Sequence, residues 1–261
     1  MEMTFISYLI LCFNMSWFYN LLMIWIFVGL CTFLYLIFSN TVAPYGRHSN
    51  SKWGITIDNK WGWFWMELPA LILMPLIVLF SSVEKNSVVI LMLFIWVYHY
   101  FYRTILFPLK LKTKGKKIPI VIVISAFIFN LLNGFFVGYD IGYISHEFDF
   151  GPNTILGSLI FFTGMYINRT SDNKLISLRK ENKDYQIPHG GMFKYISCPN
   201  HFGEIIEWIG FTIIAFNLGA LSFALWTTFN LIPRAMNHHK WYRSSFIEYP
   251  KDRKAVIPFL F

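Results

Sequence analysis

Long apolar runs follow one another along this chain, and they constrain its fold more than any other feature. A helix of about 20 apolar residues crosses the ~30 Å hydrocarbon core of a bilayer. The runs lie near residues 6–38, 64–82, 87–109, 118–138, 153–168 and 202–232. With 56% hydrophobic residues, the sequence predicts an all-α polytopic integral membrane protein. We expect residues 1–261 to form a single membrane-embedded domain.

The charged loops predict the topology. The loop around 110–117 contains five lysines and no acidic residue, whereas the loop from 139 to 152 contains three acidic residues and no Lys or Arg. By the positive-inside rule the first loop is cytoplasmic and the second lies on the other side of the membrane. The C-terminal segment 234–254 is also rich in Lys and Arg, so we expect it to be cytoplasmic as well.

This C-terminal placement requires the stretch 202–232 to cross the membrane twice. As one helix it would measure about 46 Å, which is too long for one upright crossing and short for two. The Asn217-Leu218-Gly219 sequence offers a break between two passes. The sequence therefore predicts seven transmembrane helices, with the N-terminus outside and the C-terminus in the cytoplasm.

Polar residues recur at the predicted cytoplasmic ends of several spans. The third span ends in "YHYFYRT", Asn168 and Asp172 lie four residues apart after the fifth, and Glu204 and Glu207 open the next apolar run. In "RAMNHHKWY", an Arg, a His and a Tyr follow at i, i+4 and i+8, which places them on one helix face. One such group alone is typical of a solvated helix face or an interfacial aromatic belt. Together the groups predict one convergent polar site.

Glu67 is a further polar residue, at the head of the run "WFWMELPALILMPLIVLF". A carboxylate in hydrocarbon costs roughly 2–3 kcal/mol or more, so its presence in a span is a functional-site hypothesis. The alternative is that Glu67 lies at the interface and extends its carboxylate to water.

Familiar soluble-protein motifs do not explain the polar residues. The sequence has no G-x-G-x-x-G after a strand and no G-x-x-x-x-G-K-[ST]. Gly134, Gly138 and Gly142 are better interpreted as positions of close helix packing. The three cysteines form no metal-binding pattern, so no metal is expected. The net charge of +8 indicates anionic lipid as a partner of the cytoplasmic face, and we expect no nucleic-acid partner.

Longer motifs carry a resemblance to a known family. "GMYINRTSDNKLISLRK", "IPHGGMFKYISCPNHFGEIIEWIG" and "RAMNHHKWYRSSFIEYPKDRKAVIPFLF" resemble the C-terminal half of the steroid 5-alpha-reductase family. "YGRHS", "WMELPA" and "HYFYRT" resemble its earlier motifs in the correct order. The resemblance covers about residues 40–261 and fails in the first span. The chain is similar enough to be identified as a bacterial or divergent homologue.

The resemblance implies a seven-helix membrane enzyme that transfers a hydride from NADPH to C5 and so reduces the C4–C5 double bond of a 3-oxo-Δ4 steroid. It also implies that Glu67 and Tyr100 hold the 3-keto oxygen and that Met66 and Trp208 line the substrate pocket. The positions that match the family's NADPH contacts are Asn168, Asp172, Arg179, Tyr185, Asn200, Glu204, Arg234, His238, Tyr242, Arg103 and Tyr45.

The same resemblance implies a monomer in the bacterial inner membrane or the endoplasmic reticulum, with its cofactor site facing the cytoplasm. Two residues depart from the family pattern. Met66 stands where some members carry Gln, which loosens a substrate contact, and Gln186 stands where a basic residue is usual, which leaves the preference for NADPH over NADH open. Three alternatives also stay open: a reductase of enoyl or polyprenol lipids, an isoprenylcysteine-type methyltransferase, and a transporter.

Overall fold

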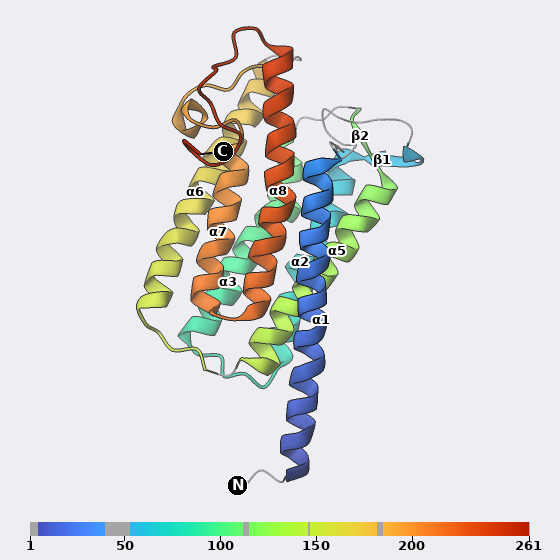
Figure 1. Cartoon of the computed structure of the whole chain (residues 1–261), viewed down its shortest axis with the longest axis vertical. Helices are drawn as coiled ribbons and strands as arrows, with labels where there is room; N and C mark the ends of the chain where they lie inside the picture. The colour runs from blue at the N-terminus through green and yellow to red at the C-terminus, as the bar shows by residue number, and fades with distance from the viewer. Residues whose placement is uncertain (1–4, 40–52, 112–114, 146, 182–184, 261) are drawn as a thin grey trace.

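The computed structural model describes residues 5–39, 53–111, 115–145, 147–181 and 185–260. Its long helices run side by side along one axis (Figure 1). They are α1 (Phe5–Phe38), α2 (Asn59–Phe80), α3 (Ser87–Phe101), α5 (Ile120–Tyr139), α6 (Pro152–Glu181), α7 (Pro199–Ala215) and α8 (Leu218–Ser245). The shorter helices are the π-helical turns η3 (Tyr102–Leu106) and η4 (Asp140–Ile144), the short α4 (Phe107–Lys110) and the 3-10 turn η5 (Gly191–Lys194).

Four helical segments in the described ranges are long and apolar enough to cross a membrane. They are Ser16–Phe38, Asn59–Phe80, Ser87–Lys110 and Ile120–Ile144. These segments coincide with the first four apolar runs of the sequence, so the predicted helical membrane class is confirmed. The third segment is continuous because η3 and α4 extend α3 without a break, and the fourth because η4 extends α5.

Helix α6 is longer than the predicted span 153–168, because it continues to Glu181. No Pro or Gly interrupts the sequence after Gly164, so nothing in the backbone ends the helix where the apolar run ends. The extra turns carry Asn168 and Asp172, which are buried. The apolar run therefore marks only the first part of α6, because polar residues on a buried helix face do not stop a helix.

The long apolar stretch 202–232 is divided where the sequence predicted. Helix α7 ends at Ala215, and Phe216 adopts a left-handed backbone with a φ of 44°. Asn217 then caps α8, accepting a hydrogen bond of 2.9 Å from the Ala220 backbone N–H. Helices α7 and α8 lie side by side, and the C-terminal segment folds over the end of the bundle opposite to the start of α1 (Figure 1).

Glycines bring α6 and α7 into backbone contact. A Cβ atom on Gly164 would lie 2.4 Å from the Glu207 backbone nitrogen, and one on Gly203 would lie 2.5 Å from the Asn168 backbone nitrogen. No larger residue fits at either position without moving a helix. Small residues at helix contacts are typical of membrane bundles. This close approach places the polar residues of α6 directly beside those of α7.

Helix α5 packs against α2 along the predicted glycine face. A Cβ on Gly138 would lie 3.1 Å from Met74, and one on Gly142 would lie 2.9 Å from Ser81. The interpretation of these glycines as packing positions is therefore confirmed. Helix α1 lies against α5 and α8, held by a hydrogen bond of 3.1 Å from Trp25 Nε1 to Asn133 Oδ1.

Two short strands were not predicted. β1 (Thr56–Asp58) and β2 (Lys117–Pro119) pair antiparallel, with Ile57 opposite Ile118. They join the segments just before α2 and α5, at the same end of the bundle as the C-terminal segment (Figure 1). Strands of three residues carry too little pattern to stand out in a sequence rich in β-branched and aromatic residues.

Candidate active site

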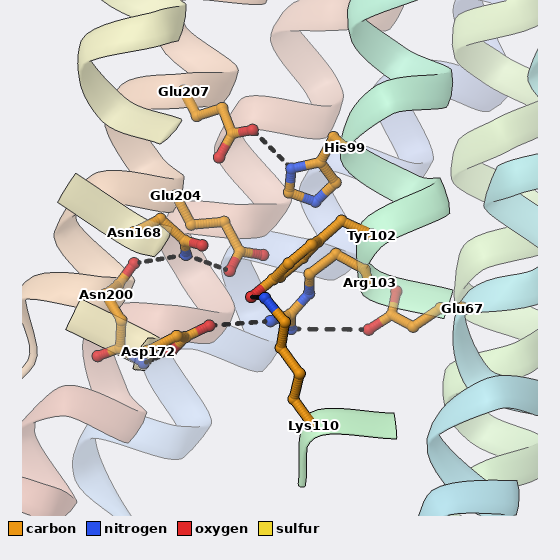
Figure 2. Close-up of polar contacts among 10 residues, drawn as sticks. All are labelled: Glu67, His99, Tyr102, Arg103, Lys110, Asn168, Asp172, Asn200, Glu204 and Glu207. Atoms are coloured by element: carbon orange, nitrogen blue, oxygen red, sulfur yellow. Dashed lines mark hydrogen bonds and ion pairs between the residues drawn. The ribbon is translucent and has the colours of Figure 1, made fainter. Parts of the chain in front are cut away.

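Arg103 is the central residue of a buried polar cluster. It lies on the π-helical turn η3, a type of turn that often occurs at functional sites. Its Nη2 is 3.7 Å from Glu67 Oε1 on α2, and its Nη1 is 3.6 Å from Asp172 Oδ2 on α6 (Figure 2). The three side chains are between 5% and 16% exposed. One guanidinium therefore joins residues from three separate helices.

Glu67 is held from a second side by Asn130 of α5. Asn130 Nδ2 lies 3.5 Å from Glu67 Oε2 and donates a hydrogen bond of 2.7 Å to the Met66 carbonyl. The carboxyl of Glu67 thus points toward Arg103 and the interior of the bundle. This geometry differs from the alternative in which Glu67 extends to water at the membrane interface.

The facing sides of α6 and α7 form the other half of the cluster. Asn168 Nδ2 donates hydrogen bonds to the Asn200 carbonyl at 3.0 Å and to Glu204 Oε2 at 3.4 Å (Figure 2). Asn200 Nδ2 donates to Asp172 Oδ1 at 3.1 Å. Within the described residues, the buried amide oxygen of Asn168 has no hydrogen-bond partner. The prediction that Asn168 and Asp172 share one helix face is confirmed.

Tyr100 lies in an aromatic cluster beside these polar groups. Its ring centroid is 5.0 Å from that of Trp96 and 5.8 Å from that of Trp208, and all three side chains are buried. Its ring also packs edge-on against the His99 ring, with centroids 5.0 Å apart. The structure therefore brings Tyr100 and Trp208 together next to the polar cluster.

Met66 does not join this aromatic cluster. Its buried side chain packs with Ile118 of β2 and with Val123 in the first turns of α5. The residue precedes Glu67 on α2, and successive residues on a helix point about 100° apart. Met66 and Trp208, assigned to one pocket by resemblance, thus belong to different apolar clusters.

A second group of residues lies around Tyr185, beyond the end of α6. Lys116 Nζ donates to the Tyr185 hydroxyl at 3.3 Å. The Arg179 guanidinium lies 5.6 Å from the Tyr185 ring, and Trp241 packs edge-on against it with centroids 5.2 Å apart. This group combines cations and a hydroxyl on the same side of the bundle as the C-terminal segment.

Helix α8 carries the remaining predicted residues. Arg234 and His238 are partly buried, and the His238 ring lies 5.8 Å from that of His201. Tyr242 is buried and stacks on Tyr249 of the C-terminal segment with ring centroids 5.2 Å apart. Their predicted spacing on one helix is confirmed. Tyr45, the last of the predicted cofactor contacts, lies outside the described residues.

Several residues of the site carried no role in the sequence prediction. Asn130 is one of two amides in a largely apolar run, and this contrast is the signal that could have marked it. Arg169 lies with its guanidinium 3.3 Å from the centre of the Tyr102 ring. His99 and Glu207 stood out as polar residues, but no sequence pattern pairs them. In the structure a hydrogen bond of 2.6 Å joins His99 Nδ1 to Glu207 Oε1.

Comparison with known proteins identifies the family of the chain. Residues 116–261, more than half of the chain, match the 3-oxo-5-alpha-steroid 4-dehydrogenase family. Steroid 5-alpha-reductase DET2 of Arabidopsis thaliana is 42% identical over 84% of this chain and 88% of the relative. The DET2 protein of Solanum lycopersicum is 37% identical over 95% and 97%, and 3-oxo-5-alpha-steroid 4-dehydrogenase 1 of Rattus norvegicus is 35% identical over 84% and 86%. The chain therefore belongs to the steroid 5-alpha-reductase family of oxidoreductases, as its motifs predicted.

Proposed function

We propose that this protein reduces the C4–C5 double bond of 3-oxo-Δ4 steroids with NADPH. The observation that carries the proposal is the Arg103 bridge, which joins Glu67 to Asp172. By resemblance, the Glu67 carboxyl contacts the steroid ketone and the Asp172 carboxyl contacts the cofactor. Their connection through one guanidinium supports a single site where the two substrates meet. Family membership favours this activity over the methyltransferase and transporter alternatives.

The residues of the site fit NADPH. Asn168 Nδ2 donates to Glu204 Oε2, and the buried amide oxygen of the same Asn168 side chain has no partner among the described residues. Two such acceptors suit a carboxamide, whose NH₂ group donates two hydrogen bonds. Arg179, Arg234 and His238 supply the cations that bind phosphates. NADPH bound across these groups would supply the hydride.

Glu67 and Tyr100 have the chemistry needed at the steroid ketone. Addition of a hydride at C5 moves electron density through C4 onto the C3 oxygen, which then needs hydrogen-bond donors. A Tyr100 hydroxyl held at this oxygen stabilises charge that exists mainly in the transition state. Glu67, fixed by Arg103 and Asn130, acts as the second group at the same oxygen. The buried rings of Trp96 and Trp208 keep water from this end of the site.

The test is NADPH oxidation by purified protein with a panel of 3-oxo-Δ4 steroids, enoyl-CoAs and polyprenols. Glu67→Ala and Tyr100→Phe should each lower steroid turnover by roughly 10²-fold, as for a lost oxyanion donor. The double variant should lose far less than the product of the two, because the residues act on one oxygen. Tyr98→Phe is the matched control, since Tyr98 is exposed on the same helix, and should keep parent activity. Full activity in Glu67→Ala, or turnover restricted to enoyl-CoAs or polyprenols, contradicts the proposal.

The cofactor assignment has its own test. Arg179→Ala and Arg234→Ala should each weaken NADPH binding by roughly 1.5–3 kcal/mol, as for a lost charge-assisted hydrogen bond. Lys251→Ala removes an exposed cation from the C-terminal segment and should leave the affinity unchanged. Unchanged affinity in both arginine variants would mean that these cations serve lipid headgroups alone.

The proposal includes seven membrane spans with the C-terminus in the cytoplasm. It is supported by the turn between α7 and α8, which returns the chain to the end where α6 finishes (Figure 1). Asp149→Cys and Lys251→Cys introduce thiols at exposed positions at opposite ends of the bundle. In bacterial spheroplasts, an impermeant maleimide should label Asp149→Cys directly and Lys251→Cys after lysis. Labelling of Lys251→Cys before lysis would exclude this topology.

A further inference from the structure

His99 of α3 and Glu207 of α7 form a buried pair at the deep end of the polar cluster (Figure 2). Their side chains are 3% and 1% exposed, and a hydrogen bond of 2.6 Å joins His99 Nδ1 to Glu207 Oε1. Within the described residues, Glu207 Oε2 has no hydrogen-bond partner. Burying two ionisable groups is costly, and apolar residues of similar volume often stabilise such a position better. The pair therefore needs an explanation beyond stability.

The residues around the His99–Glu207 pair suggest such an explanation. The His99 ring packs edge-on against Tyr100, with centroids 5.0 Å apart, and against Trp208, with centroids 4.7 Å apart. His99 precedes Tyr100 on α3, and Glu207 precedes Trp208 on α7. One hydrogen bond thus links the two helices at the residues immediately before both aromatic rings. Rotation or sliding of α3 against α7 would move Tyr100 and Trp208, and this hydrogen bond opposes it.

We propose that His99 and Glu207 are positioning residues that hold the Tyr100 hydroxyl and the Trp208 ring in place for the steroid. This inference rests on the proposed function, in which Tyr100 binds the 3-keto oxygen. A displacement of about 1 Å at a reacting group can lower a rate by roughly 10²-fold, so the orientation of Tyr100 needs support from a second layer of residues. In this proposal neither His99 nor Glu207 contacts the steroid, and both act through their neighbours.

The competing explanation is that the pair only holds the bundle together. That role would reduce the amount of folded protein, while each folded molecule would turn over at the parent rate. A positioning role would instead lower kcat per NADPH-binding site and leave the NADPH dissociation constant nearly unchanged. The two explanations therefore differ in a quantity that can be measured on folded protein alone.

The experiment compares His99→Leu, Glu207→Leu and the double Leu variant with the conservative variant Glu207→Gln. Each Leu variant should lose about 10-fold or more in kcat, while the NADPH dissociation constant changes by less than about threefold. Glu207→Gln should recover most of the turnover, because its amide oxygen can still accept a hydrogen bond from His99. The double variant should regain thermal stability, since neither polar group is left unpaired, but should not regain turnover.

Asp140 provides a matched control far from the site. Its buried carboxyl accepts a hydrogen bond of 2.7 Å from the Gly219 backbone N–H, where η4 meets the start of α8. Asp140→Asn should lower the melting temperature without lowering kcat per NADPH-binding site. Parent kcat in the double Leu variant, together with an impaired Tyr100→Phe, would overturn the positioning role and leave the proposed function standing. Full activity in Tyr100→Phe would overturn both.

Discussion

The contact between α6 and α7 differs in kind from the contacts of α1 with its neighbours. Helices α6 and α7 meet backbone to backbone at Gly164 and Gly203, and polar side chains lie along the seam. Helix α1 instead meets the bundle through large rings, with Trp25 and Trp226 centroids 4.5 Å apart. On its outer side α1 leaves large apolar side chains such as Phe27, 64% exposed, where a bilayer would cover them.

The difference shows how a membrane bundle can hold a polar site. Lipid is as apolar as a leucine side chain, so contact between helices depends on close packing and hydrogen bonds rather than on apolar burial. At the glycine seam, backbone contact fixes the positions of α6 and α7. The hydrogen-bonded side chains of Asn168 and Glu204 are therefore held in fixed positions as well. Rings such as those of α1 can adjust without moving a catalytic group. The site is therefore expected to depend on α6 and α7 far more than on α1.

The largest expected effect comes from removing Arg103, the cation at the centre of the polar cluster. Arg103→Ala leaves the carboxyls of Glu67 and Asp172 buried without their shared guanidinium. Breaking a buried ion pair by removing one partner costs about 3–5 kcal/mol. We expect NADPH-dependent turnover to fall below detection and the melting temperature to drop. Activity assays and thermal unfolding in detergent measure both.

Two further variants make the Arg103 prediction specific. Arg103→Lys should recover part of the stability and little of the turnover, because an ammonium group lacks the fork that reaches two carboxyls at once. Arg243→Ala removes an exposed cation near the end of α8 and should change neither quantity measurably. If Arg103→Ala turned over steroid normally, the polar half of the bundle would not contain the site.

The glycine seam gives the next largest effect. Gly203→Ala puts a Cβ 2.5 Å from the Asn168 backbone nitrogen, so α6 and α7 must separate. Overpacking typically costs about 1–3 kcal/mol, and here it also displaces Asn168 from Glu204. We expect a lower melting temperature and weaker NADPH binding in the same variant. Isothermal titration and thermal unfolding measure the two effects.

Gly134→Ala is the matched control on the apolar side. Its Cβ would lie 3.5 Å or more from the nearest atoms of α2, which is ordinary contact. Because Ala favours helix by up to about 1 kcal/mol over Gly, this variant should be neutral or slightly stabilising. Equal damage from Gly134→Ala and Gly203→Ala would show that the loss does not come from the close backbone contact of α6 and α7.

The same contrast explains which parts of the fold were predictable. Hydropathy identified the first four spans because a lipid-facing helix is apolar along its whole length. The apolar run 153–168 covers only the first part of α6, because Asn168 and Asp172 are polar although both are buried, and their burial depends on another helix. The break before α8 was predictable, since a cap such as Asn217 is a local signal.

The site was predictable only where its geometry is local. Spacing placed Asn168 and Asp172 on one face, because residues four apart on a helix are neighbours. Nothing in the spacing connects Arg103 to Glu67, or His99 to Glu207, since these pairs form only when distant helices pack. The predicted roles of individual residues came from the resemblance to family motifs, which names the residues but does not show which of them contact one another. Met66 packs apart from Trp208, and the place of both residues in one substrate pocket stays a prediction.

The smallest expected effect concerns α1, and it tests whether that helix can change without consequence for the site. Trp25→Phe removes the N–H that donates to Asn133 Oδ1 at 3.1 Å, while an aromatic ring still faces Trp226. Asn133 keeps its own hydrogen bond to the Phe129 carbonyl at 2.8 Å. Losing one hydrogen bond of this kind costs about 0.5–1.5 kcal/mol.

Since 1 kcal/mol shifts the melting temperature of a protein of roughly this size by about 2–4 °C, Trp25→Phe should melt a few degrees lower than the parent. Its kcat and NADPH dissociation constant should be those of the parent, because in the described part of the chain the hydrogen bonds of the Trp25 and Asn133 side chains involve no residue of the polar cluster. Adding Asn133→Leu removes the acceptor left without its donor and should return part of the lost stability. A fall in kcat without a fall in melting temperature would contradict the comparison, because it would show that α1 positions the site as α6 and α7 do.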